Sequence, residues 1–172
     1  MKIAVTDACI FIDIYDLRLT SELFKLPFEI HTSADVFSEL YEEQQELLRP
    51  YVTAQKMIIH NLVESERYEI LNAVYPSSLS MNDKTVLYLA DRLNAIILSS
   101  DKVVRTTAKR KSIEYHGMLW IFDRLVEGNF LSTNDAIAKL KLLISRNIVY
   151  QNNTELVNEM NKRIKLWSKS RS

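Results

Sequence analysis

Glycine is nearly absent from this chain of 172 residues, which contains only Gly117 and Gly128. The dinucleotide-binding loop GxGxxG and the phosphate-binding loop GxxxxGK[ST] each need several glycines at fixed spacing, because the backbone must approach the phosphates closely. Neither spacing can be built from positions 117 and 128. The composition therefore excludes both of these nucleotide-binding loops.

Cysteine is equally scarce, since Cys9 is the only one. An intramolecular disulfide and a paired CxxC metal site are excluded. The sequence also lacks the HExxH motif of zinc peptidases and the GxSxG motif of serine hydrolases. Carboxylates are thus the side chains expected to carry any chemistry.

A charge excess and long apolar runs are missing as well. Lys+Arg and Asp+Glu number 22 each, so bulk charge does not indicate a nucleic-acid partner, although a local basic patch remains compatible with it. No apolar run approaches the roughly 20 residues that span a bilayer. Asp7 and Asp13 interrupt the apolar start of the chain, which argues against a signal peptide. We expect a cytoplasmic protein without a membrane partner.

Apolar spacing, proline and capping residues predict strands that alternate with helices. The strands are expected at about 2–6, 28–32, 56–62, 95–99 and 113–116. The helices are expected at about 10–26, 34–48, 65–75, 80–93, 101–111, 118–127, 133–144 and 153–168. This alternation predicts a parallel sheet flanked by helices. Residues 1–144 are expected to form the main domain, and 145–172 a C-terminal helical extension of the same domain.

Four acidic residues are expected near the carboxyl end of the sheet, where ligands bind in such folds. Asp7 and Asp101 each end a predicted strand and precede a helix. Glu39 and Asp83 come early in helices that would pack on the sheet. All four side chains can converge over the same end of the sheet.

Each acid also has a simpler interpretation. Aspartate is a favoured helix N-cap, which would account for Asp7 and Asp101. Asp83 fits a capping box with Ser80, although it also lies on the apolar stripe of its helix. Glu39 has acidic neighbours, as on a charged helix face. Asp13 and Asp16, which follow Asp7, lie off the apolar stripe of their helix and are expected to be solvated.

A cluster of these four carboxylates would need a cation or protons. Two carboxylates about 4 Å apart repel by roughly 4 kcal/mol at an effective dielectric of about 20. Oxygen ligands without cysteine or histidine favour Mg²⁺ or Mn²⁺. Such an ion activates water and stabilises the leaving oxygen in phosphodiester hydrolysis. The four acids therefore suggest metal-dependent cleavage of a phosphodiester.

A basic segment follows Asp101 and reads DKVVRTTAKRK. A solvated helix face is the simpler interpretation. Beside a metal site, however, these cations would be placed to meet a nucleic-acid backbone. The residues concerned are Lys102, Arg105, Lys109, Arg110 and Lys111.

Several motifs together resemble the PIN domain family over residues 2–126. They are VTDACIFID, the acid of the second helix, LSMNDKTVLYLA and ILSSDKVVR. The segment IEYHGMLWIFDRLV is similar to the last strand and helix of many PIN proteins. The resemblance implies a Rossmann-like three-layer α/β/α sandwich with a central, mostly parallel sheet, here with extra C-terminal helices.

The resemblance also implies a function, namely a Mg²⁺- or Mn²⁺-dependent endoribonuclease, in bacteria often the toxin of a toxin–antitoxin pair. By this resemblance the catalytic and metal-binding acids are Asp7, Glu39, Asp83 and Asp101, supported by Ser99 and Cys9. At the position of Cys9 the family commonly has Asn, Ser or Thr, and a thiol is a weaker hydrogen-bond partner. The expected partners are an RNA substrate, an antitoxin protein and a second copy of the chain. The alternative function is an inactive PIN-like module that binds RNA or protein.

Overall fold

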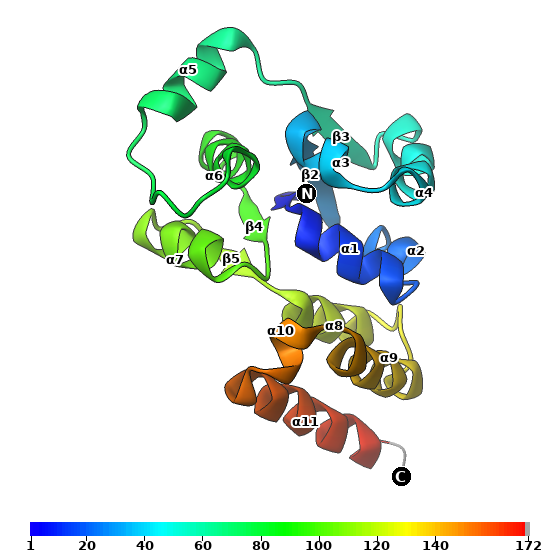
Figure 1. The fold of residues 1–172 in the computed structure, drawn as a ribbon. Coiled ribbons are helices and arrows are strands. Elements are labelled where there is room, and N and C mark those ends of the chain that lie inside the picture. Colours follow the sequence, from blue (N-terminus) through cyan, green and yellow to red (C-terminus); the bar gives the residue numbers. More distant parts are fainter. Residues whose placement is uncertain (171–172) are drawn as a thin grey trace.

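Five strands form one all-parallel sheet in the order β3-β2-β1-β4-β5 in the computed structural model, which describes residues 1–170 (Figure 1). The strands are β1 (Lys2–Thr6), β2 (Phe28–Ser33), β3 (Met57–His60), β4 (Ile96–Leu98) and β5 (Tyr115–His116). All five lie where the sequence predicts them. The expected α/β fold is confirmed.

Two hydrophobic cores cover the two faces of this sheet. Neighbouring strand residues point to opposite faces, so Ala4 enters the first core and Val5 the second. The first core is built by α1 (Ala8–Asp16), α2 (Thr20–Leu23), α4 (Glu42–Thr53), α8 (Met118–Glu127), α9 (Thr133–Arg146), α10 (Ile148–Gln151) and α11 (Thr154–Lys169). The second receives side chains from α3 (Ala34–Glu39), α5 (Glu64–Asn72), α6 (Met81–Leu93) and α7 (Lys102–Arg110). The result is the three-layer α/β/α arrangement that the sequence predicts.

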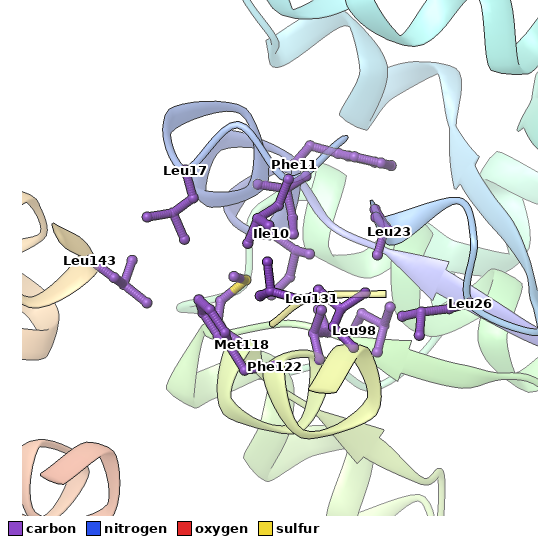
Figure 2. Packing of buried hydrophobic residues seen from close by; sticks show 14 of the residues in the cluster. Ile10, Phe11, Leu17, Leu23, Leu26, Leu98, Met118, Phe122, Leu131 and Leu143 are labelled. Atoms are coloured by element: carbon purple, nitrogen blue, oxygen red, sulfur yellow. The ribbon is translucent and has the colours of Figure 1, made fainter. Parts of the chain in front are cut away.

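The first core joins segments that lie far apart in the sequence. Figure 2 shows Ile10 and Phe11 of α1 together with Met118 and Phe122 of α8 and Leu143 of α9. Burial of each such side chain contributes on the order of 2 kcal/mol. The helix that follows Asp7 is thereby packed against the C-terminal half of the chain.

Two predicted helices are each split in the structure. The helix expected at 10–26 is α1 and α2, because the chain turns at Arg18, whose φ is 53°. The helix expected at 34–48 is α3 and α4. The side-chain amide of Gln45 donates to the carbonyls of Phe37 and Leu40, at 3.1 and 2.9 Å, and so satisfies the end of α3. Pro50, expected after this helix, lies inside α4.

The C-terminal helices share the first core. Tyr150 of α10 and Met160 and Trp167 of α11 are all buried in it. Arg163 of α11 donates two hydrogen bonds to the carboxylate of Asp123 of α8, each of 2.8 Å. The boundary expected between 144 and 145 falls in the last turn of α9, which continues to Arg146.

The scarcity of glycine affects the turns that follow helices. Within residues 1–170, five residues have φ between 49° and 58°, and none of them is glycine. They are Arg18, Gln55, Asn94, Ser112 and Asn129. For a residue with a Cβ atom, this left-handed conformation costs about 1 kcal/mol or more. The fold accepts this cost at positions where glycine is the usual residue.

The longest helix among residues 1–170 is α11, with 16 residues. None of the helices in this part of the chain is both long and apolar enough to cross a membrane.

Candidate active site

The candidate site lies where the direction of the sheet's connections reverses. From β1 the chain crosses over to β2 on one side, whereas from β4 it crosses to β5 on the other side. In open parallel sheets, ligands bind in the crevice outside the carboxyl ends of the two strands at this point. Asp7 directly follows β1, and its N–H donates to the carbonyl of Leu98 in β4, at 3.2 Å.

Asp7 is a buried carboxylate held by several donors. Its side chain is the N-cap of α1 and accepts a hydrogen bond from the N–H of Ile10 at 3.3 Å. The thiol of Cys9 donates to Oδ1 at 2.7 Å, and the hydroxyl of Ser99 donates to Oδ2. Only 5% of the residue is exposed. Asp7 is thus both the N-cap of α1 and a buried carboxylate, so capping alone does not describe its environment.

Burial raises the pKa of Asp7 from 3.8 to about 6. The hydrogen bonds from Cys9, Ser99 and Ile10 lower it, and the charge of Asp83 raises it further. The Asp83 carboxylate therefore lies close enough to repel that of Asp7. A cation bound near Asp7 would offset both the desolvation of its carboxylate and this repulsion.

Asp83 also forms the capping box that the sequence predicts. The N–H and the hydroxyl of Ser80 both donate to Oδ2 of Asp83 at 2.8 Å, and the N–H of Asp83 donates back to Ser80 Oγ at 3.1 Å. The residue is half-buried. Helix α6 is joined to Ser33, the last residue of β2, by a hydrogen bond of 2.7 Å between the buried hydroxyls of Thr85 and Ser33. Ser33 is also the N-cap of α3, a capping role for which Thr32 and Ser33 are the candidates in the sequence.

The other two predicted acids are placed differently. Asp101 is the exposed N-cap of α7, and Oδ1 accepts from the N–H groups of Val103 and Val104, both at 2.8 Å. Its own N–H donates to Ser99 Oγ at 3.1 Å, so Ser99 links Asp101 to Asp7. Glu39 is exposed at the end of α3. Within residues 1–170, no three His, Cys, Asp or Glu side chains form a group that could hold a metal ion.

Cys9 makes both hydrogen bonds expected of a hydroxyl at this position. The thiol donates to Asp7, and Sγ accepts from the N–H of Ser100 at 3.2 Å. Burial, followed by the charge of Asp7, raises the pKa of the Cys9 thiol. Cys9 is therefore a protonated hydrogen-bond donor rather than a thiolate nucleophile.

The expectation that Asp13 is solvated is wrong, whereas Asp16 is exposed as predicted. Asp13 accepts hydrogen bonds from the Asn147 amide and from the Tyr150 hydroxyl, both at 3.1 Å. Both partners belong to the region around α10, which the sequence pattern does not place beside α1. The sequence contains one indication that Asp13 faces the protein rather than solvent. Asp13 lies four residues after Cys9 and therefore shares its helix face.

The basic residues of α7 lie at different distances from Asp101. Lys102 is adjacent to it, whereas Lys109, Arg110 and Lys111 come about 12 to 15 Å further along the helix axis. The guanidinium of Arg105 lies 5.3 Å from the ring centre of Tyr115, and the ammonium of Lys111 lies 5.2 Å from that of Tyr75. The other three cations are exposed.

The donor chemistry around Asp7 fits a hard divalent cation. Mg²⁺ is commonly bound through one or two carboxylates, keeps several waters and meets the substrate through phosphate oxygens. Asp7 and Asp83 supply two carboxylates whose charges interact, and the buried one, Asp7, has a raised pKa. A group of three protein ligands is not needed for such a site.

Comparisons with known proteins bear on the whole chain. A family model described as a PIN domain matches residues 3–166. Among solved structures, the chain is similar to a PilT N-terminus domain protein from the archaeon Sulfolobus solfataricus P2, at 13% identity and a TM-score of 0.48, over 73% of this chain and 94% of that chain. It is also similar to a domain of a functionally unknown protein from Methanocaldococcus jannaschii DSM 2661, at 24% identity and a TM-score of 0.46, over 69% and 91%. No curated protein matches the sequence.

Proposed function

The chain belongs to the PIN domain family, a nuclease-type fold, and from this premise we propose that it is a metal-dependent endoribonuclease with its site at Asp7. The observation that carries the proposal is the buried Asp7 carboxylate at the reversal point of the sheet. Its pKa is raised to about 6, and it lies beside the charge of Asp83. An acid held this way is typical of functional sites rather than of simple helix caps.

The proposed metal ligands are Asp7 and Asp83, whose charges interact in this structure. Asp101 and Glu39 do not complete a three-residue metal group among residues 1–170, and we propose them as the acids that would join the first two when the ion binds. When bound, Mg²⁺ or Mn²⁺ supplies activation of the attacking water and neutralises charge on the phosphate. The protein itself orients the carboxylates that would bind the ion. Ser99 and Cys9 orient Asp7, and Ser80 orients Asp83. In-line attack of water would leave 5′-phosphate and 3′-hydroxyl ends.

A nucleic acid is the proposed substrate because exposed cations follow Asp101 directly, and the family resemblance points to RNA. Lys102 lies beside the site, and Lys109 and Arg110 extend the positive charge along α7. Each phosphate contact with a single strand contributes about 0.7 to the slope of log affinity against log salt. With a net charge of zero, this local patch supplies the electrostatic attraction.

We further propose that the protein acts in the cytoplasm as the toxin of a toxin–antitoxin pair, with an antitoxin protein and a second copy of the chain as partners. The family resemblance supports this role. Induced expression should arrest growth of a host cell, and co-expression of a small protein encoded beside the gene should restore it. If the Asp7→Asn variant arrests growth as strongly as the parent, the toxin role does not depend on this site.

The direct test of the nuclease is cleavage of a labelled RNA by purified protein. Activity should require Mg²⁺ or Mn²⁺, disappear with a chelator, and fall at least about 100-fold in Asp7→Asn, because a carboxylate ligand is lost. Asp16→Asn is the matched control, since Asp16 lies on the same helix and is exposed. Equal cleavage by Asp7→Asn and the parent protein would show that the site assignment is wrong.

A second candidate function is RNA binding without cleavage. The observation that favours it is that Asp83 and Asp101 already accept capping hydrogen bonds and that no three-residue metal group occurs in the described part of the chain. In that case RNA binding would persist across several metals without turnover. Lys102→Ala should weaken this binding and reduce its salt dependence, whereas Lys56→Ala, exposed just before the start of β3, should leave both unchanged.

A further inference from the structure

The hydroxyl of Tyr150 lies between α1 and the loop that carries two proposed site residues. It donates to Asp13 Oδ2 at 3.1 Å, and its oxygen lies 3.0 Å from Ser100 Oγ. Tyr150 is 2% exposed and Asp13 is 5% exposed. Ser100 stands between Ser99, which bonds to Asp7, and Asp101.

The direction of these hydrogen bonds follows from the donors available. Asn147 accepts from the N–H of Val149 through Oδ1, which turns its amide NH₂ toward Asp13 Oδ1 at 3.1 Å. Both oxygens of Asp13 therefore accept. The single hydrogen of the Tyr150 hydroxyl is used on Asp13, so the Ser100 hydroxyl donates to Tyr150.

The loop from Ser99 to Asp101 is thereby held from both sides. On the side of Asp7, the Ser100 N–H donates to Cys9 Sγ, and the Asp101 N–H donates to Ser99 Oγ. On the other side, Tyr150 fixes the Ser100 side chain. Removal of the Tyr150 hydroxyl would leave a buried carboxylate and a serine without this partner, which loosens one side of the loop.

We propose that Tyr150 is a positioning residue for the site, through which the C-terminal helices hold the loop of Ser99 and Asp101 in place. The inference rests on the proposed function for its effect on cleavage. The contact itself does not depend on that function. If Tyr150 contributed only through its buried ring, its role would be purely structural. Tyr150→Phe distinguishes this structural role from the positioning role, because the substitution keeps the ring and removes only the hydroxyl.

The first readout is amide hydrogen exchange at Ser100 and Asp101, measured on the full chain by NMR. Exchange at these two amides should quicken about 10-fold in Tyr150→Phe, while amides of β2 stay unchanged. Tyr88→Phe is the matched control, because the Tyr88 hydroxyl donates to Glu69 between α5 and α6 instead. Unchanged exchange at Ser100 and Asp101 would overturn the inference, whether or not the protein cleaves RNA.

The second readout is the kinetics of RNA cleavage. Tyr150→Phe should lower kcat about 10-fold with little change in KM, because positioning of the ligands is lost but RNA contacts remain. Ser100→Ala should do the same, and the double variant should be no worse than either single one, since both remove one contact. Multiplicative losses in the double variant would show that the two hydroxyls act separately and would overturn the inference. If the parent protein does not cleave RNA, the proposed function fails, and the exchange result alone decides the positioning role.

Discussion

Asp7 is a carboxyl group whose charge is unfavourable in the folded protein. Its pKa rises from 3.8 to about 6 on folding, chiefly because of burial. The folded state therefore binds a proton more tightly than the unfolded state. The stability that this proton contributes is fully present below about pH 4 and is lost as the pH rises through about 6.

This linkage predicts an unusual effect of Asp7→Asn. At pH 7 the variant should be more stable than the parent by up to about 3 kcal/mol, because an amide avoids the buried charge. Below about pH 4 the difference should vanish. Urea denaturation between pH 3.5 and 8 measures the stability difference at each pH. Asp16→Asn is the control, and its stability should match that of the parent. A variant that is less stable than the parent at pH 7 would contradict the burial of an ionised Asp7.

Cys9 offers a second prediction at the same scale. Cys9→Ser keeps a donor to Asp7 and an acceptor for Ser100, and a hydroxyl is the stronger donor, so the pKa of Asp7 should fall. Mn²⁺ binding should tighten about 3-fold at pH 6, where Asp7 is partly protonated, and change little at pH 8. Electron paramagnetic resonance of free Mn²⁺ measures this. Cys9→Ala removes this hydrogen bond and should therefore bind Mn²⁺ more weakly at pH 6, again with little change at pH 8. Equal behaviour of the two variants at pH 6 would refute the role of the Asp7 hydrogen bond.

At the scale of single residues, the sequence predicts the local structure around part of the candidate site. Asp7 and Asp101 follow strands of recognisable apolar pattern, and Ser80 with Asp83 forms a recognisable capping box. Asp13 was misplaced because its partner Tyr150 lies 137 residues away in the chain. A tyrosine hydroxyl leaves no mark on apolar periodicity, so local patterns cannot reveal the contact.

At the scale of elements, Ser112 illustrates the left-handed turns. This exposed residue has a φ of 57°. Ser112→Gly should stabilise the protein by about 0.5–1 kcal/mol, because glycine adopts this conformation without a Cβ clash. The same substitution at Ser145, an exposed residue inside α9, should destabilise it by a similar amount. Thermal unfolding of the two variants measures whether their stability changes have opposite signs. If both changes had the same sign, the left-handed turn would not be the cause.

Helix boundaries were harder to predict than helix positions. Apolar periodicity placed every strand, because each strand is a short apolar run between turn residues. It could not show that the side chain of Gln45 would satisfy the carbonyls at the end of α3 and divide one expected helix in two. Such hydrogen bonds depend on tertiary geometry that the pattern of apolar residues does not contain.

For the whole molecule, the shared core predicts that the C-terminal helices unfold together with the sheet. The two tryptophans report on separate places, Trp120 in α8 and Trp167 in α11. Met160→Ala removes a fully buried side chain of α11 and should cost about 2 to 5 kcal/mol. In a Trp167→Phe background, the fluorescence of Trp120 should show this loss in full. If Met160→Ala left the unfolding transition of Trp120 unchanged, residues 145–172 would unfold independently of the sheet.

The strand order of the sheet has a consequence for the time course of synthesis. β1 pairs with β2 early, but its other edge stays open until β4 has been made, and Asp7 meets Ser99 only across 92 residues of chain. Tyr150 arrives later still. A ribosome that translates this message therefore carries an unfinished site until β4 and Asp101 have emerged, so the residues proposed to cut RNA cannot come together while only the first strands have been made.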